Sequence, residues 1–314
     1  MRKYFTTLIL PFIVLLSAVA ASVLCGGAEL NWQDFRHDPV LELRMIRVLA
    51  ALVVGSSLAL GGMTFQAVLR NPLAEPFTLG ISGGASVGAA LAFVLNLNVQ
   101  SFYAVPLMAL TGALLLLGMV LALARNKGAE SLLLSGVIAG TVASSILMYL
   151  VSAADNTELA GISWWMLGDL QAVDTMMLYP ALGILLAGTL VLQFFARELN
   201  ALALGDLYAW SLGVNHRFFT VFLIFVASIL AVQTVVLAGL IAFVGLIVPH
   251  LVRRFYGCDH RRIVLPAALW GGAFLIICDW LARIVPGKSE LPVGVLTAAI
   301  GGAMFIYVLH RRRA

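Results

Sequence analysis

The chain has 314 residues, of which 62% are hydrophobic and 11% are charged, and its mean hydropathy is +1.03. Soluble domains are far more polar, so this composition excludes a soluble globular protein and predicts an all-α integral membrane protein with one membrane domain, 1–314. The net charge of +4 is explained below by the positions of the basic residues, without nucleic-acid binding.

Apolar runs long enough to cross a bilayer recur along the whole chain. The first run follows Arg2 and Lys3 and ends near Ala18-Val19-Ala20, so a cleaved signal peptide is the alternative to an uncleaved first span, which the many later spans favour. The run 218–252 is too long for one crossing and short for two, but Gly239 and Gly245 offer a break near its middle. The runs are 5–24, 46–68, 78–97, 104–124, 132–153, 176–196, 263–281, 292–309 and the long run 218–252.

The positions of Lys and Arg decide how often 218–252 crosses. With two crossings, one side of the membrane carries 14 of the 19 basic residues, as the positive-inside rule requires of the cytoplasmic side. A single crossing would move the basic groups at 253–262 and 311–313 to the side opposite the basic residues that precede 218, and the charge bias would be lost. We therefore expect about ten transmembrane helices, with both ends of the chain in the cytoplasm.

Three connections between spans are long enough to carry structure of their own. Two are external, 25–45 and 154–175, and the second holds Trp164 and Trp165, which suit a short helix at the water–lipid boundary. The third is cytoplasmic, 200–217, and is too apolar for a plain solvated linker. Its apolar residues could coat one side of a short helix that stops at Gly213 and receive a soluble partner, or could pack back on the bundle. They are Leu202, Leu204, Leu207, Tyr208, Trp210 and Leu212.

Two enzyme-like strings fail on inspection. The segment 286–290 resembles the end of a nucleotide-binding P-loop, but Ala282 stands where its first glycine belongs. The string Gly80-Ile81-Ser82-Gly83 matches an intramembrane serine protease motif, yet the one histidine near a span, His250, lies at a helix end. A protease that uses Ser82 remains a distant alternative.

The remaining polar residues give no sign of a catalytic or metal centre. The three cysteines are far apart, and no cluster of metal ligands is evident. Ionisable groups inside spans are nearly absent apart from Asp279, four residues before Arg283, whereas ion-coupled carriers usually keep them at mid-span. An ion-coupled carrier is therefore the less favoured alternative, and the motor of a transporter would be another subunit.

The chain resembles the permease subunits of type II ATP-binding-cassette (ABC) importers, the FecCD-type family that carries iron-siderophore complexes, haem and cobalamin. The matching strings, in order over nearly the whole chain, are GMTFQAVLRNPLAEPFTLGISGGASVGA (62–89), LALGDLYAWSLGV (202–214), GLIAFVGLIVPHLVRRFYGCDHRRIVLP (239–266) and ELPVGVLTAAIGGAMF (290–305). The resemblance implies two permease copies, either a homodimer or this chain with a related one, around one pathway in the bacterial cytoplasmic membrane. It also implies two cytoplasmic ATPase subunits, which bind the ATP and magnesium that this chain does not, and an extracytoplasmic binding protein.

The same resemblance implies three groups of functional residues. Leu204, Gly205, Asp206, Ala209, Leu212 and Gly213 would dock on the ATPase, although Leu207 stands where the family often has an acidic residue. Arg44, Arg47 and Arg283 would receive the binding protein, although the first pair reads RMIR where the family has RLPR; the alternative is that they pair with Asp38, Glu42 and Asp279. Ile81, Ser82, Gly83, Gly84 and Ala85, after the turn at Pro72 and Pro76, would form a cytoplasmic gate with Ser135 in 130–136.

These residues together predict a transport subunit without catalysis of its own. The cargo implied is a metal chelate, a ferric siderophore or haem, and the near alternative is cobalamin or molybdate.

Overall fold

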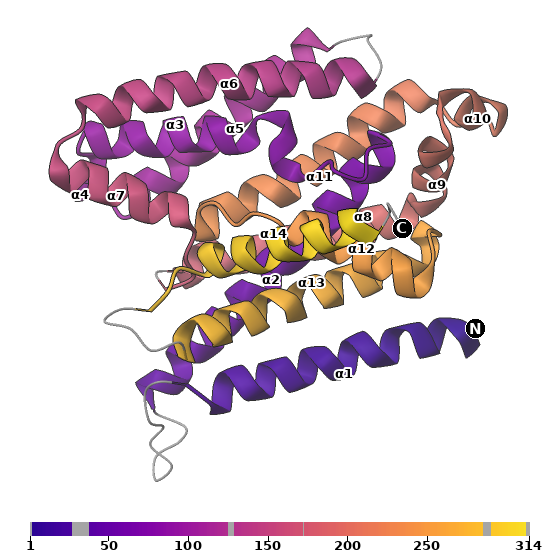
Figure 1. Ribbon diagram of the computed structural model, residues 1–314, viewed down its shortest axis with the longest axis horizontal. Helices are drawn as coiled ribbons and strands as arrows, with labels where there is room; N and C mark the ends of the chain where they lie inside the picture. The colour runs from indigo at the N-terminus through magenta and orange to yellow at the C-terminus, as the bar shows by residue number, and fades with distance from the viewer. Residues whose placement is uncertain (1, 27–37, 125–128, 172, 285–289, 312–314) are drawn as a thin grey trace.

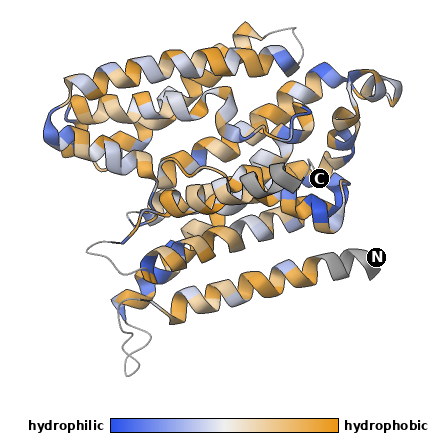
Figure 2. Ribbon diagram, in the orientation of Figure 1, coloured by the Kyte–Doolittle hydropathy of each residue, from blue (hydrophilic) through white to orange (hydrophobic). Residues whose placement is uncertain are grey.

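The computed structural model describes residues 2–26, 38–124, 129–171, 173–284 and 290–311. Within these ranges the chain is helical with short connections and has no strand, so the all-α prediction is confirmed. The long helices run roughly along one direction, and their ribbons are mostly apolar with polar residues gathered at the ends (Figures 1 and 2). This distribution is the one a lipid environment favours, because only helix ends reach water.

The helices follow one another in a simple order. They are α1 (Arg2–Leu24), α2 (Pro39–Val68), the 3₁₀ turn η2 (Pro76–Leu79), α3 (Ile81–Val94), α4 (Leu97–Gln100), α5 (Ala104–Leu123), α6 (Ala129–Ala153), α7 (Asn156–Leu167), α8 (Thr175–Phe194), α9 (Ala196–Leu204), α10 (Asp206–Ser211), α11 (His216–Ala238), α12 (Val244–Tyr256), α13 (His260–Ile284) and α14 (Val293–Arg311).

Ten of these helices correspond to the ten predicted spans. Among the described residues, six are both long and apolar enough to cross a membrane unaided: α2, α5, α6, α8, α11 and α13. The other four are α1, α3, α12 and α14. The predicted break in 218–252 is confirmed, since α11 ends before Gly239 (φ +66°) and α12 begins after Phe243 (φ +69°).

Both ends of the helical chain lie at the same end of the bundle. The start of α1 and the end of α14 lie on the side of α9 and α10, whereas α4 and α7 lie at the opposite end (Figure 1). This arrangement agrees with an even number of crossings. It also places the two predicted external connections away from the predicted cytoplasmic one.

The structure changes the outline of the two external connections. Helix α2 begins at Pro39, inside the predicted loop 25–45, because Asp38 caps it by accepting from the Val40 N–H at 2.8 Å and Pro39 suits a first helical turn. Residues 27–37 of that loop lie outside the described part of the chain. The helix predicted near Trp164 is present as α7, and Asp155 and Glu158 form a capping box at its start.

Helix α2 is the centre of the bundle. Of its most apolar stretch 89% is buried, and it packs against α11, α12 and α13. Two glycine pairs bring the backbones together: a Cβ on Gly55 would lie 2.2 Å from the Gly271 carbonyl oxygen, and one on Gly62 would lie 1.9 Å from that of Gly245. Small residues at helix crossings are how membrane helices gain packing contact, because lipid gives no hydrophobic driving force between them.

We expect Gly62→Ala to lower the free energy of unfolding by about 3 kcal/mol or more, because the added methyl meets backbone that cannot rotate away. Thermal melting and size-exclusion chromatography in detergent measure the effect. Gly183→Ala on α8 is the control, since its Cβ would meet nothing within 4 Å. Equal melting temperatures for the two variants would contradict the close packing of α2 on α12.

Candidate functional sites

The predicted coupling segment is two helices rather than one. Helix α9 ends at Leu204 and α10 begins at Asp206, because Gly205 adopts φ +116°, which breaks the helix. The expectation that Leu202 joins the outward apolar face is wrong, since Leu202 is buried in the core. The predicted stop is confirmed: Leu212 caps α10 and Gly213 follows with φ +76°.

Five apolar side chains of this segment remain exposed. Leu207 is 83% exposed and Trp210 is 73% exposed. Ala209, by contrast, is fully buried and its carbonyl accepts from the Val214 N–H at 2.9 Å, which holds α10 to the chain that follows. The alternative that the whole segment packs back on its own bundle therefore does not hold. The exposed face, which we call the coupling surface, consists of Leu204, Leu207, Tyr208, Trp210 and Leu212.

The coupling surface is tied to the bundle at two points. Asp206 accepts from the Arg70 guanidinium at 3.2 Å, and Arg70 begins the connection from α2 to η2. On α9, Asn200 donates to Asp259 at 2.8 Å, in the turn between α12 and α13. Hydrogen bonds from Arg261 and then Asn200 lower the pKa of Asp259 to about 2, so this carboxylate is charged at neutral pH.

The elements that carry the two predicted gate segments pack against each other, since α6 contacts both α3 and the η2 turn before it. A Cβ on Gly136 of α6 would lie 2.5 Å from the Thr78 carbonyl oxygen in η2, and Gly80 turns the chain into α3 with φ +80°. Of the predicted gate residues on α3, Ile81, Gly84 and Ala85 are buried, whereas Ser82 and Gly83 are half-buried, as is Ser135 on α6. Their contact is structural, and their role as a gate stays a prediction.

Helix α6 has few neighbours within this chain. Only 22% of its apolar window is buried, and the segment 131–153 contains no charged residue. The hydroxyl groups on its exposed side donate to carbonyls of their own helix, so they are satisfied without a partner. These bonds run from Thr141, Ser144, Ser145 and Ser152 to Val137, Gly140, Thr141 and Tyr149, at 2.8 to 3.1 Å.

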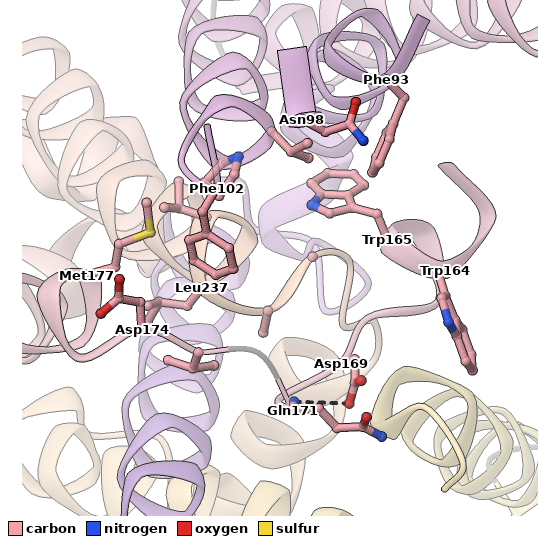
Figure 3. Close-up of a pocket in the computed structure, with 16 residues that line it drawn as sticks. Phe93, Asn98, Phe102, Trp164, Trp165, Asp169, Gln171, Asp174, Met177 and Leu237 are labelled. Carbon is pink, nitrogen blue, oxygen red and sulfur yellow. Dashed lines mark hydrogen bonds between the residues drawn. The ribbon is translucent and has the colours of Figure 1, made fainter. Parts of the chain in front are cut away.

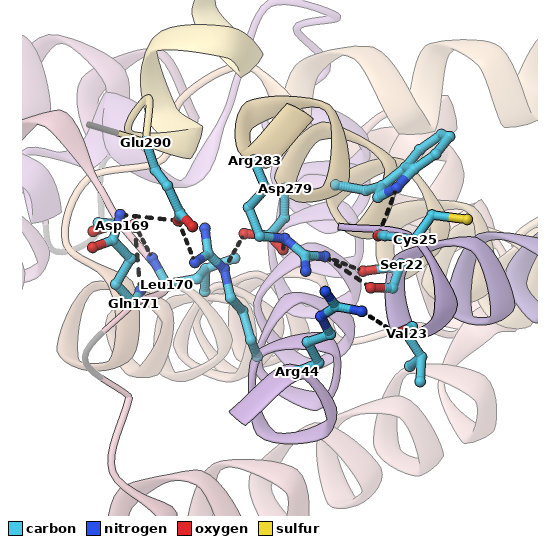
Figure 4. A network of polar contacts seen from close by, with 12 residues as sticks. Ser22, Val23, Cys25, Arg44, Asp169, Leu170, Gln171, Asp279, Arg283 and Glu290 are labelled. Atoms are coloured by element: carbon cyan, nitrogen blue, oxygen red, sulfur yellow. Dashed lines mark hydrogen bonds and ion pairs between the residues drawn. The ribbon is translucent and has the colours of Figure 1, made fainter. Parts of the chain in front are cut away.

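The three predicted docking arginines lie near the start of α2 and the end of α13, at the end of the bundle opposite α10, and Figure 4 shows Arg44 and Arg283 there beside Asp279. Arg47 donates to Asp279 Oδ1 at 2.6 Å and to Glu290 Oε2 at 2.6 Å. Arg283 contacts Asp279 Oδ2 at 3.2 Å, which confirms the i,i+4 pair expected on α13. Asp279 is completely buried. A carboxylate buried between two guanidinium groups is a compensated charge, so these three side chains form one unit.

Two of these arginines also hold the end of α1. Arg44 donates to the Val23 carbonyl at 2.7 Å, Arg283 donates to the Ser22 carbonyl at 3.2 Å, and Trp280 donates to the Cys25 carbonyl at 3.1 Å. The last carbonyls of a helix lack partners within it, and cations are favoured there. The arginines are therefore turned inward, and docking of a binding protein on them stays a prediction.

Sequence reasoning missed Glu290 and the carbonyls of α1 as partners of these arginines. The residues lie far apart in the sequence, with Arg47 and Glu290 separated by 243 positions. No local spacing signals such a contact.

Comparison with known proteins shows which proteins this chain is similar to. The sequence model of the FecCD transport family matches residues 6–311. The vitamin B12 import system permease BtuC of Pectobacterium atrosepticum is 36% identical, over 98% of this chain and 93% of that protein. The hemin transport system permease HmuU of Yersinia pestis is 34% identical, over 98% and 96%. A solved metal-chelate type ABC transporter in an inward-facing conformation superposes with a TM-score of 0.88 at 27% identity, over 98% and 99%.

We expect Asp279→Asn to lower the free energy of unfolding by about 3 kcal/mol, because it leaves two buried guanidinium groups without their shared counter-charge. The melting temperature in detergent reports the loss. Glu42→Gln removes one acidic charge from the exposed first turn of α2 and should change stability by no more than about 0.5 kcal/mol. Equal melting temperatures would show that the buried carboxylate does not hold the arginines.

Proposed function

Since the chain belongs to the FecCD transport family, we propose that it is the membrane-spanning permease of an ABC importer that moves a ferric siderophore or haem into the cell. Its relatives are permease subunits, so this chain is a transport subunit and not an enzyme. Hydrolysis of magnesium-bound ATP belongs to two partner ATPase subunits. The membrane is the bacterial cytoplasmic membrane, with both chain ends in the cytoplasm.

The coupling surface is the observation that carries this proposal. Five large apolar side chains on a short projecting segment are unfavourable in water, and burying a side chain of that size contributes about 1.5–3 kcal/mol. A soluble partner that covers them gains enough to offset part of the cost of association. The ATPase fits this role because it must bind at the cytoplasmic end and drive movement there.

A movement of the coupling surface can be transmitted to the gate residues through a short stretch of the chain. Asp206 is paired with Arg70, and from Arg70 the chain runs through η2 to Ile81 and the glycines that follow. These residues contact α6. ATP-driven closure of the partner subunits would thereby shift the pathway between outward-open and inward-open states.

The exposed face of α6 supports a second permease copy around a shared pathway. It is uncharged, and its hydroxyl groups are already bonded. Such a wall offers little that is selective for one chelate, so cargo choice rests with the binding protein. The relatives reported above are named for vitamin B12 and hemin, which supports cobalamin and haem as cargo. Cobalamin or molybdate is the near alternative to a ferric siderophore or haem.

The binding protein would dock on the arginine cluster by exchanging acceptors. An incoming carboxylate can form a bidentate pair with a guanidinium, whereas Glu290 makes a single contact with Arg47, from Oε2 to Nη1. Glu290 is 42% exposed, and it is the acceptor most easily replaced. Asp279 stays in place because it is buried.

Uptake into proteoliposomes tests the function. The chain is reconstituted with its co-purifying ATPase and binding protein, and labelled ferric siderophore, haem and cobalamin are offered in turn. Uptake that needs ATP, stops with vanadate and is competed by one unlabelled chelate supports the proposal and identifies the cargo. Uptake abolished by an uncoupler and insensitive to vanadate would indicate an ion-coupled carrier. Proteolysis that is lost in Ser82→Ala would indicate a protease.

Leu207→Asp should reduce the ATPase that co-purifies with the chain by about tenfold or more, because it places a charge in the centre of the buried contact. Val99→Asp on α4, which is 79% exposed at the other end of the bundle, is the matched control and should retain the ATPase. Quantitative immunoblotting of affinity-purified protein measures both. If both variants retain equal amounts of the ATPase, the coupling surface is not where the ATPase binds.

Glu290→Gln should lower the Kd of the binding protein by roughly twofold to fivefold. The substitution removes an exposed carboxylate that competes for Arg47, in a contact worth about 0.5–1 kcal/mol. Glu42→Gln makes the same charge change nearby and should have a smaller effect. Surface plasmon resonance on nanodisc-embedded protein gives the Kd. A larger Kd for Glu290→Gln would mean that Glu290 holds Arg47 in its docking position instead of competing for it.

A further inference from the structure

A pocket of about 360 Å³ opens at the same end of the bundle as the arginine cluster. It lies where α3 and α11 end and where α5 and α8 begin, beside Trp164 and Trp165 near the end of α7 (Figure 3). Helix ends of a membrane bundle mark the boundary between lipid and water, and Trp164, 54% exposed on α7, is a residue type typical of that boundary. The pocket is therefore accessible from the membrane surface.

The walls of this pocket combine aromatic rings with carboxylates. Phe93, Phe102 and Trp165 come from three separate segments, and Asp169 and Asp174 stand on its other sides (Figure 3). No lysine, arginine or histidine is among the described residues that line it. Aromatic faces and carboxylates both attract a cation, and this combination is the usual means by which proteins bind organic ammonium groups.

The two carboxylates differ in how they are held. Asp174 caps α8 and accepts from the Tyr103 hydroxyl at 2.5 Å, and this bond, followed by that from the Met176 N–H, lowers its pKa, so it is ionised at neutral pH. Burial raises the pKa of Asp169, whereas hydrogen bonds from the Leu170 and Gln171 N–H groups and the positive charge of Arg47 act in the opposite direction. A cation bound beside Asp169 would further favour its ionised form.

The pocket does not suit the proposed cargo. A volume of 360 Å³ is near the lower end of the range of about 300–1,000 Å³ for small-molecule sites. Haem and cobalamin are large macrocycles, and haem carries two carboxylates of its own, which Asp169 and Asp174 would repel. An ammonium group on a small body fits both the size and the charge.

We propose that this pocket binds an organic ammonium group at the membrane surface, as carried by the ethanolamine headgroup of a phospholipid or by a free amine. The site is separate from the coupling surface and from the gate residues. Gln171 lines the pocket and donates to Glu290 at 3.2 Å, so an occupant would lie beside the arginine cluster. The inference depends on the pocket alone and not on the proposed cargo.

Native mass spectrometry of delipidated protein tests the lipid source, with phosphatidylethanolamine and phosphatidylglycerol added in equal amounts. We expect phosphatidylethanolamine to be retained in preference. Titration with ethanolamine and tetraethylammonium, followed by the melting temperature in detergent, tests the free-amine source. Retention of the lipid without an amine effect assigns the site to a headgroup, and stabilisation by both amines assigns it to soluble amines. No preference between the lipids and no amine effect would overturn the proposal.

Paired variants tie the result to the pocket. Asp174→Asn removes a carboxylate, and Phe102→Leu keeps an apolar side chain but removes the ring from a position that is 56% exposed. Each should weaken binding of the retained ligand by about tenfold. Glu42→Gln and Phe255→Leu are exposed controls outside the pocket and should bind as wild type does. If Phe102→Leu, folded by size-exclusion chromatography, binds as tightly as its control, the pocket is not the site.

Discussion

The close approach of α2 to its neighbours is the constraint on which the rest of this structure depends. In lipid, helices gain nothing from burying apolar surface against one another, so they associate where backbones can come close. The pairs Gly55 with Gly271 and Gly62 with Gly245 provide that approach on two sides of α2. With α2 enclosed in this way, α11, α12 and α13 have fixed positions around it.

The same helix connects the two ends of the molecule that carry the predicted functional residues. Its 30 residues span about 45 Å, enough to cross the membrane with some length to spare. Arg44 and Arg47 lie near its start, and Arg70, paired with Asp206 of the coupling segment, lies just after its end. A single buried helix thus carries part of the predicted docking site and part of the predicted connection to the motor. Because α2 is buried along most of its length, its two ends cannot move independently of each other.

The periphery of the bundle has the opposite character. Helix α6 is mostly uncovered, and the coupling surface keeps five apolar side chains in the open. Both features are expected of a subunit that is complete only in an assembly, because a surface that is unfavourable alone becomes favourable when covered. The arginine cluster differs from these surfaces, since its charges are already satisfied within the chain.

Local sequence determined the membrane-spanning character, the ten spans, the break near Gly239 and the stop at Gly213, because hydropathy, charge bias and glycine conformations act over one or two helical turns. The matching strings likewise indicated the family. Only the tertiary structure decided that Leu202 is buried while Leu204 is exposed, that Arg47 shares Asp279 with Arg283 and reaches Glu290, and that aromatic and acidic residues from separate segments line one pocket. Such contacts join residues far apart in the chain, and their existence depends on how helices pack, which no local pattern encodes.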